Sequence, residues 1–298
     1  MKFEFRGVIS AMITPLKNSG REIDEKALRT YCDFLISKGV KGLFICGTTG
    51  EGPLMSVEER KRISEIIVDQ VKNRAKVIIN SGYITTDDTI ALIKHSQKIG
   101  ADAAAVVLPY YYSLDDRSLI DHFIKIARTV PELPFFIYNI PENTINNFVP
   151  HILEEIFEKV DNFAGIKTSN ADLLQLQEYI DLLHGEIPIY YGNDKLNVPA
   201  LAMGAAGIIS GNASVFPEPF IKLYKNFKEG ELEKARQQQA FNYKMATILK
   251  DGKYPAVYKK SLELLGINVG NVRPPHRELL PDEVEHLTRS LKELELVN

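Results

Sequence analysis

The chain has 298 residues, of which 45% are hydrophobic and 25% charged, as expected for a globular protein that buries a large core. A net charge of -3 argues against a nucleic-acid partner and leaves no basic face for a membrane, and two cysteines exclude a disulfide framework. No run approaches ~20 apolar residues, and residues 1–6 do not resemble a signal peptide. We therefore expect a cytoplasmic protein of enzyme size.

Short apolar runs alternate with helical patterns along the chain. The run at residues 7–15 closes with a proline, and apolar residues at helical spacing then continue from 24 to 38 and end at Gly39. A second run at 42–46 precedes Ser56 and Glu59, whose spacing predicts a capping box at a helix start. Further strands, each followed by a helix, are predicted at residues 77–79, 104–108, 135–138, 163–167, 187–191 and 207–210.

Eight such units within about 230 residues predict a TIM barrel, an α/β fold, over residues 1–229. A doubly wound sheet is the alternative, but it more often carries a Gly-rich fingerprint after its first strand, and residues 11–15 are not one. After Gly230 the strands stop and helices are predicted at 232–251, 254–265 and 282–296. We interpret residues 230–298 as a C-terminal helical extension.

Chemistry in such barrels takes place at the carboxyl ends of the strands. The residues that follow the apolar runs are Thr14, Thr48, Thr49, Tyr111, Tyr138, Asn139, Lys167, residues 192–194 and Ser210. Lys167 ends an apolar strand, where loss of water should lower the pKa of its amine and favour Schiff-base formation with a carbonyl. Most strand-end lysines instead reach solvent or pair with a carboxylate, and that alternative stays open for Lys167 taken alone.

The other groups suggest an α-keto acid substrate and neither a metal nor a cofactor. The chain has no metal-ligand spacing and no Ser/His/Asp arrangement, and its six histidines fall mostly within or beside helices. Tyrosine phenols can transfer protons, and the N–H groups of the Gly-Thr-Thr-Gly turn can hold a carboxylate. The tyrosines at 110–112 are equally typical of an interface, and residues 47–52 of a simple turn.

Five motifs resemble, in order, those of the dihydrodipicolinate synthase / N-acetylneuraminate lyase superfamily of pyruvate-dependent aldolases. They are Gly47-Thr48-Thr49-Gly50-Glu51, Pro109-Tyr110-Tyr111, Tyr138-Asn139-Ile140-Pro141, Gly165-Ile166-Lys167 and Gly192-Asn193-Asp194, and the resemblance covers the whole chain. It implies a Schiff base between Lys167 and pyruvate or a related 2-oxo acid, and proton transfer by Tyr138. It further implies carboxylate binding by Thr48 and Thr49. Tyr111 would complete a hydroxyl relay from a neighbouring subunit of a homotetramer.

Two positions depart from the named activities of this superfamily. Asn143 stands where dihydrodipicolinate synthases usually place an arginine, and Lys195 where sialic acid lyases usually place a glutamate. An asparagine cannot form a charge-assisted bidentate pair with a carboxylate, so we expect the 2-keto-3-deoxygluconate or 4-hydroxy-2-oxoglutarate aldolase branch. The alternatives are the synthase, a deoxy-oxo sugar acid dehydratase, or a catalytically silent barrel that only binds keto acids.

The predicted site residues fall into two groups. Lys167, Tyr138, Thr48 and Tyr111 are the expected catalytic residues. The expected substrate-binding residues are Thr48, Thr49, Gly192, Asp194, Ser210 and Asn143, and Asn139, Lys195 and Asn212 are further positions that could bind sugar-acid hydroxyls.

Overall fold

The computed structural model describes residues 3 and 5–298. Eight parallel strands form a closed barrel in the order β1-β10-β9-β8-β7-β6-β5-β4, which confirms the predicted TIM barrel. The strands are β1 (Val8–Ala11), β4 (Gly42–Ile45), β5 (Lys76–Asn80), β6 (Ala103–Val107), β7 (Phe135–Asn139), β8 (Phe163–Thr168), β9 (Ile189–Tyr191) and β10 (Gly207–Ser210). Nearly every strand residue is buried, as expected for parallel strands with both faces covered.

The first two helices that follow the strands begin at side chains that cap them. The side chain of Asp24 accepts a hydrogen bond from the Ala27 N–H at the start of the first helix, and Ser56 and Glu59 form the expected capping box. These helices are α1 (Glu25–Ser37), α2 (Val57–Val71), α3 (Thr86–Lys98), α4 (Asp116–Ala127), α6 (Pro150–Lys159), α7 (Leu173–Leu182), α8 (Asn197–Met203) and α9 (Pro217–Lys228).

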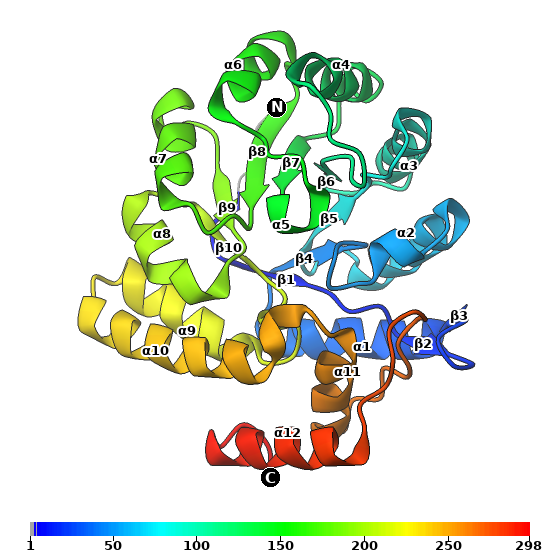
Figure 1. The fold of residues 1–298 in the computed structure, drawn as a ribbon, viewed down its shortest axis with the longest axis vertical. Helices are drawn as coiled ribbons and strands as arrows, with labels where there is room; N and C mark the ends of the chain where they lie inside the picture. Colours follow the sequence, from blue (N-terminus) through cyan, green and yellow to red (C-terminus); the bar gives the residue numbers. More distant parts are fainter. Residues whose placement is uncertain (1–2, 4) are drawn as a thin grey trace. The chain divides into compact units, whose positions relative to one another are not determined.

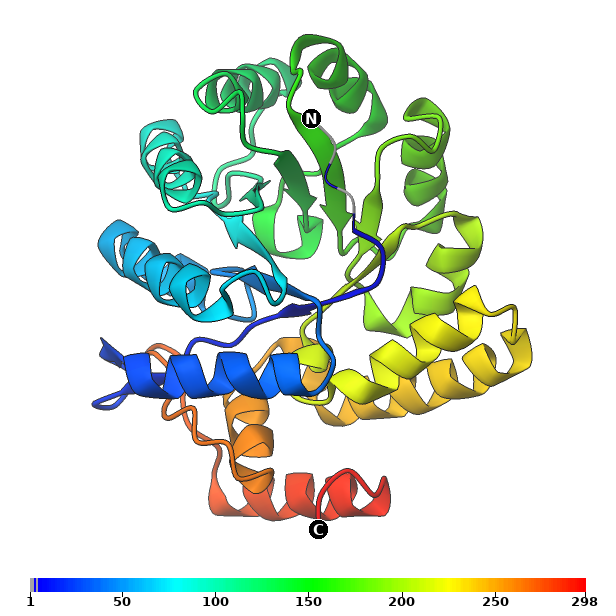
Figure 2. The same ribbon diagram turned by 180° about the vertical axis from the view of Figure 1, so that it is seen from behind.

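The chain divides into two compact units, and the first contains residues 77–209 with the N-terminal residues up to Gly7. Within this unit, α3, α4, α6 and α7 lie outside strands β6 to β9 in both views (Figures 1 and 2). The register of β7 against β8 places Tyr138 opposite Lys167. Gly165 permits this close pairing, because a Cβ there would overlap the Phe136 ring and the Pro188 carbonyl oxygen.

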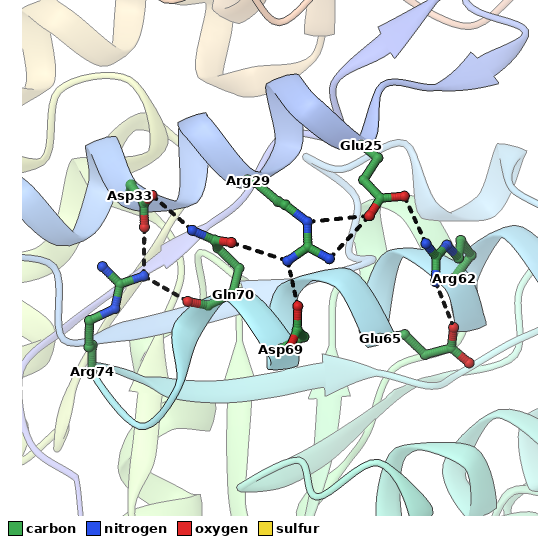
Figure 3. Close-up of polar contacts among 8 residues, drawn as sticks. All are labelled: Glu25, Arg29, Asp33, Arg62, Glu65, Asp69, Gln70 and Arg74. Carbon is green, nitrogen blue, oxygen red and sulfur yellow. Dashed lines mark hydrogen bonds and ion pairs between the residues drawn. The ribbon is translucent and has the colours of Figure 1, made fainter.

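The second unit contains residues 8–76 and 210–298. Polar side chains link its helices α1 and α2 in a network around Arg29, which donates to Glu25, Asp69 and Gln70 (Figure 3). The network is half-exposed, and ion pairs of this kind contribute only about 0–1 kcal/mol each. Packing of the apolar faces of α1 and α2 therefore dominates this contact.

Three helices and a 3₁₀ turn follow the barrel, as the sequence predicts. They are α10 (Leu232–Ile248), η4 (Lys250–Gly252), α11 (Pro255–Leu264) and α12 (Pro281–Glu293). Helices α9 and α10 lie side by side in both views (Figures 1 and 2). Helix α10 ends earlier than expected because Lys250 and Asp251 adopt positive φ, which stops the helix. The domain boundary at residue 229/230 stays a prediction.

A short hairpin and a short helix were not expected from the sequence. Strands β2 (Leu16–Lys17) and β3 (Glu22–Ile23) form a hairpin after β1, and helix α5 (Pro141–Thr144) follows β7. Both are too short for hydrophobic periodicity to indicate them. Among the helices of the described residues, none combines the length and apolarity needed to span a bilayer.

Candidate active site

Lys167 lies near the carboxyl end of β8 and is 4% exposed. Burial lowers the pKa of its ammonium from the ordinary 10.5 to about 7, because the charged form loses its hydration. The negative charge of Asp194 opposes part of this shift. The lysine therefore carries a large fraction of free amine at neutral pH, the form that attacks a carbonyl carbon.

Tyr138 is the aromatic partner of this amine. The Nζ atom of Lys167 lies 3.9 Å from the centroid of the Tyr138 ring, so the cation faces the π surface. Tyr138 is buried on β7, and its strand register with β8 fixes the pair. Lys167 and Tyr138, two of the predicted catalytic residues, are thus in contact.

Glycine at position 192 keeps space beside Lys167. A Cβ at Gly192 would overlap the Ser169 hydroxyl and lie 3.5 Å from the Cε atom of Lys167. The Gly192 N–H donates to the Thr168 carbonyl oxygen at 2.8 Å and carries the chain into the turn η2 (Asp194–Leu196). Gly192 and Asp194 therefore border the lysine.

Thr48 and Thr49 lie in the turn that follows β4, in the second unit. The left-handed residues Cys46 and Glu51 bracket this turn, with φ values of 57° and 56°. Its backbone closes on itself through the Glu51 N–H, which donates to the Thr48 carbonyl oxygen at 3.1 Å. A tight turn of this kind directs neighbouring N–H groups outward, the arrangement that binds carboxylates.

The carboxylate of Glu51 holds this turn through two contacts, one to each of its oxygens. Its Oε1 atom lies 2.8 Å from Nζ of Lys259 on α11, in an ion pair whose side chains are 0% and 2% exposed. Its Oε2 atom accepts the Arg273 N–H at 2.7 Å. Burial lowers the pKa of Lys259, and the Glu51 charge opposes that shift. Helix α11 and the loop after it thus hold the threonine turn.

Tyr258 of the same helix, α11, lies near Thr49. A Cβ at Gly211 would lie 2.9 Å from Oγ1 of Thr49 and 3.1 Å from the hydroxyl of Tyr258, so glycine leaves room for both. The Tyr258 hydroxyl donates to Oδ1 of Asn212 at 2.8 Å. Ser210 is buried, and its Oγ accepts the Ala213 N–H at 3.0 Å. Both Ser210 and Asn212 already serve local structure.

Asn139 is a buried residue of β7 whose side-chain amide bonds to neighbouring protein groups. It is fully buried, its Oδ1 accepts the Phe148 N–H, and its Nδ2 lies within hydrogen-bond distance of Asn147, Gln175 and Tyr179. The amide therefore fastens the segment after α5 to α7. Sequence position alone could not show that the Asn139 amide is bonded within the protein, because Tyr138 beside it stands at the end of the same apolar run.

Tyr111 and Asn143 are exposed. Tyr111 is 77% exposed, has a φ of 82° and packs edge-on against Tyr112 with ring centroids 5.0 Å apart. Asn143 is an exposed neutral residue of α5. Tyr111 and Asn143 therefore lie at the surface, whereas Lys167 is buried.

The family model of the dihydrodipicolinate synthetase family matches residues 4–294. The chain belongs to this family. It is 35% identical over 297 residues to the 4-hydroxy-tetrahydrodipicolinate synthase of Methanocaldococcus jannaschii, a match that covers 98% of this chain and 100% of the relative.

Solved structures of family members agree with the fold. The dihydrodipicolinate synthase of Aquifex aeolicus has a TM-score of 0.93 at 31% identity, covering 98% of this chain and 99% of the other. A prophage protein of E. coli K12, solved in complex with pyruvate, has a TM-score of 0.92 at 28% identity, covering 98% and 99%.

Membership in the dihydrodipicolinate synthetase family confirms the resemblance to the pyruvate-dependent aldolases. The protein is a carbon–carbon lyase of this class. The relatives named synthase support the alternative activity better than the 2-keto-3-deoxygluconate branch that we expected first. The roles of individual site residues stay predictions. Within residues 3 and 5–298, no group of three or more His, Cys, Asp or Glu side chains could hold a metal ion.

Sequence reasoning missed the residues that support the site. Lys259 and Arg273 lie far from the motifs in sequence, and no local pattern marks Lys259 as a buried partner of Glu51. The position of a charged residue, Glu51, between Gly50 and Gly52 was the available indication in the sequence of a tight turn that needs support.

We predict that Lys259→Met destabilises the protein by about 3–5 kcal/mol, because it leaves the buried Glu51 carboxylate without its cation. The double variant Glu51→Gln/Lys259→Met should recover part of the loss, since it buries no unpaired charge. Urea unfolding of parent and variants measures both effects, with Lys260→Met on the outer face of α11 as the control. A double variant less stable than Lys259→Met would contradict the ion-pair account.

We predict that the rate of pyruvate trapping at Lys167 with cyanoborohydride rises through pH 7 and levels off above it. The lowered pKa means that the amine is charged below about pH 7 and free above that pH. Asp194→Asn should move the midpoint to lower pH, because the Asp194 charge raises the lysine pKa. Adduct mass measured against pH tests this, and a midpoint near 10 would contradict the burial argument.

Proposed function

We propose that the protein condenses pyruvate with aspartate 4-semialdehyde, the reaction of a 4-hydroxy-tetrahydrodipicolinate synthase. The observation that carries the Schiff-base step is the buried amine of Lys167 against the ring of Tyr138. The choice of aldehyde is supported by relatives from two archaea, which carry the synthase name at 35% and 34% identity.

The proposed reaction begins when the free amine of Lys167 attacks C2 of pyruvate and water is lost to give an imine. Removal of a proton from C3 gives an enamine, which attacks the aldehyde carbon and forms the new C–C bond. The amino group that came from the semialdehyde then attacks the imine carbon, which closes the ring and releases the lysine amine. The Tyr138 phenol transfers protons in these steps, and Thr48 and Thr49 bind the keto-acid carboxylate.

A second candidate is the cleavage of 2-keto-3-deoxygluconate to pyruvate and glyceraldehyde. The observation that favours it is Asn143, an exposed neutral residue where a carboxylate-binding arginine is usual in synthases. A synthase with this asparagine needs another cation for the second carboxylate. Lys195, half-buried directly after Asp194, is the candidate. A dehydratase of deoxy-oxo sugar acids shares the Schiff base but releases no pyruvate.

The assembly is also a proposal. Tyr111 is 77% exposed and Tyr112 66%, and aromatic side chains of this exposure suit burial against a second copy of the chain. A homotetramer in which Tyr111 completes a neighbour's hydroxyl relay fits this exposure. The two cysteines are free and buried, in keeping with a reducing cytoplasmic location.

We expect pyruvate with borohydride to add one reduced pyruvate to the intact protein, at Lys167. Lys167→Arg should form no adduct, because a guanidinium stays protonated and cannot condense. Intact mass and peptide mapping test this, and the exposed Lys26 provides a matched control when replaced by arginine. Trapping that persists in Lys167→Arg would assign the Schiff base elsewhere.

A substrate panel then identifies the aldehyde. Pyruvate with aspartate 4-semialdehyde should give condensed product, whereas 2-keto-3-deoxygluconate should release no pyruvate if the synthase assignment is right. Pyruvate release from the sugar acid, with no condensation, would select the second candidate. Loss of water without pyruvate would select the dehydratase.

We predict that Tyr138→Phe lowers kcat by about 10²–10⁴-fold, the usual contribution of a positioned proton-transfer group. Phenylalanine keeps the ring against the Lys167 amine and removes only the hydroxyl, so the pyruvate KM should change much less. Steady-state kinetics measures both. Equal losses in turnover and pyruvate binding would argue that the phenol acts in binding.

A further inference from the structure

The loop after β6 holds Tyr111 in an unfavourable backbone conformation. Its φ of 82° lies in a region that a bulky side chain rarely adopts and that costs free energy. The exposed Tyr111 ring contacts only its neighbour Tyr112 among the aromatic rings described. Other parts of the fold must therefore hold the loop in this shape.

One buried side chain holds the loop on both sides of Tyr111. Asn146, 4% exposed, donates from Nδ2 to the carbonyl oxygens of Pro109 at 2.7 Å and Tyr112 at 2.9 Å. Its Oδ1 accepts the Leu114 N–H at 2.9 Å. These three bonds fix the chain two residues before Tyr111 and one and three residues after it. A buried amide satisfied in this way defines a single loop conformation.

Asn146 is itself fixed by the end of α5. The Thr144 hydroxyl joins the two, because it lies 3.0 Å from the carbonyl oxygen of Ile140 and 2.8 Å from the carbonyl oxygen of Asn146. Ile145 between them has a φ of 64°, an outlier for a β-branched residue, and is 67% exposed. Two strained segments, at Tyr111 and Ile145, are thus joined by one asparagine.

We propose that Asn146 is a positioning residue for Tyr111. The inference rests on the proposed function, in which the Tyr111 phenol completes the hydroxyl relay. Asn146 offsets the backbone penalty at Tyr111 and presents the phenol at the distance and angle that proton transfer requires. Without it, the loop relaxes toward negative φ and the phenol moves out of place.

Asn146→Asp tests this with little change in shape. The new oxygen cannot donate to Pro109 or Tyr112, whereas the bond from the Leu114 N–H can remain. A misplaced catalytic group lowers turnover by up to about 100-fold, so we expect kcat to fall about 10- to 100-fold. The yield of trapped pyruvate at Lys167 should be retained, because the hydrogen bonds of the Asn146 side chain go to the loop after β6 and to Thr144.

Asn162 provides a matched control. It is 3% exposed, and its Nδ2 lies 3.3, 2.8 and 3.0 Å from the carbonyl oxygens of Ala127, Val130 and Leu133. It directly precedes β8 and so lies at the opposite end of that strand from Lys167. Asn162→Asp breaks the same kind of amide clamp away from Tyr111, and it should lower stability comparably while leaving kcat within about threefold of the parent.

A double-mutant cycle with Tyr111→Phe separates positioning from general destabilisation. If Asn146 acts through the phenol, Asn146→Asp should lower kcat no further once the phenol is absent, whereas Asn162→Asp should have the same small effect in both backgrounds. Asn146→Ala provides a second variant if the aspartate variant does not fold.

Three outcomes would overturn the inference. They are an unchanged kcat in both Asn146 variants, effects of Asn146→Asp and Tyr111→Phe that multiply, or an equal loss of kcat in Asn162→Asp. In each case the parent still traps pyruvate, and the proposed function stands. A parent that turns over no substrate and traps no pyruvate would overturn the proposed function and this inference together.

Discussion

The loss of water around the Lys167 ammonium is the constraint on which the site depends. A lysine in the interior of a closed barrel is a poor choice for stability, because burial disfavours the charge that the same residue carries freely in the unfolded chain. Between pH 7 and the ordinary pKa of 10.5, the unfolded chain binds a proton on this lysine that the folded chain does not. The lysine therefore lowers the free energy of unfolding most strongly at and below neutral pH. The apolar strands around it supply the compensating stability.

Several of the predicted site residues are held by side chains outside the motifs. The register of β7 and β8 and the small residues Gly165 and Gly192 make the room that Lys167 and Tyr138 need. The threonine turn is held by a buried ion pair from α11, and the Tyr111 loop by an amide beyond α5. Each of these supporting residues fixes the position of a neighbouring segment and has no proposed role in the chemistry. Such support is expected where functional groups must be placed to within a fraction of an ångström.

Periodicity predicted the barrel, its helices and the C-terminal extension, because long apolar strands and amphipathic helices leave a regular trace. The motifs predicted the Lys167–Tyr138 contact and the turn at Thr48. The sequence could not show that the Asn139 amide bonds to other protein groups, since Asn139 stands beside Tyr138 at the end of the same apolar run. Nor could it find Asn146 or Lys259, whose partners are determined by tertiary contacts across many residues of chain.

The support of the threonine turn also has a consequence for the order of folding. Glu51 is synthesised early, but its partner at the Arg273 N–H lies 222 residues later in the chain. Until the C-terminal helices leave the ribosome, the Glu51 carboxylate has neither its cation nor this donor, and burying it alone is unfavourable. The first barrel strands therefore emerge with a turn that must stay hydrated. Contacts of such long sequence separation make folding slow. The N-terminal part of the protein is therefore complete only after the last helices have formed and packed.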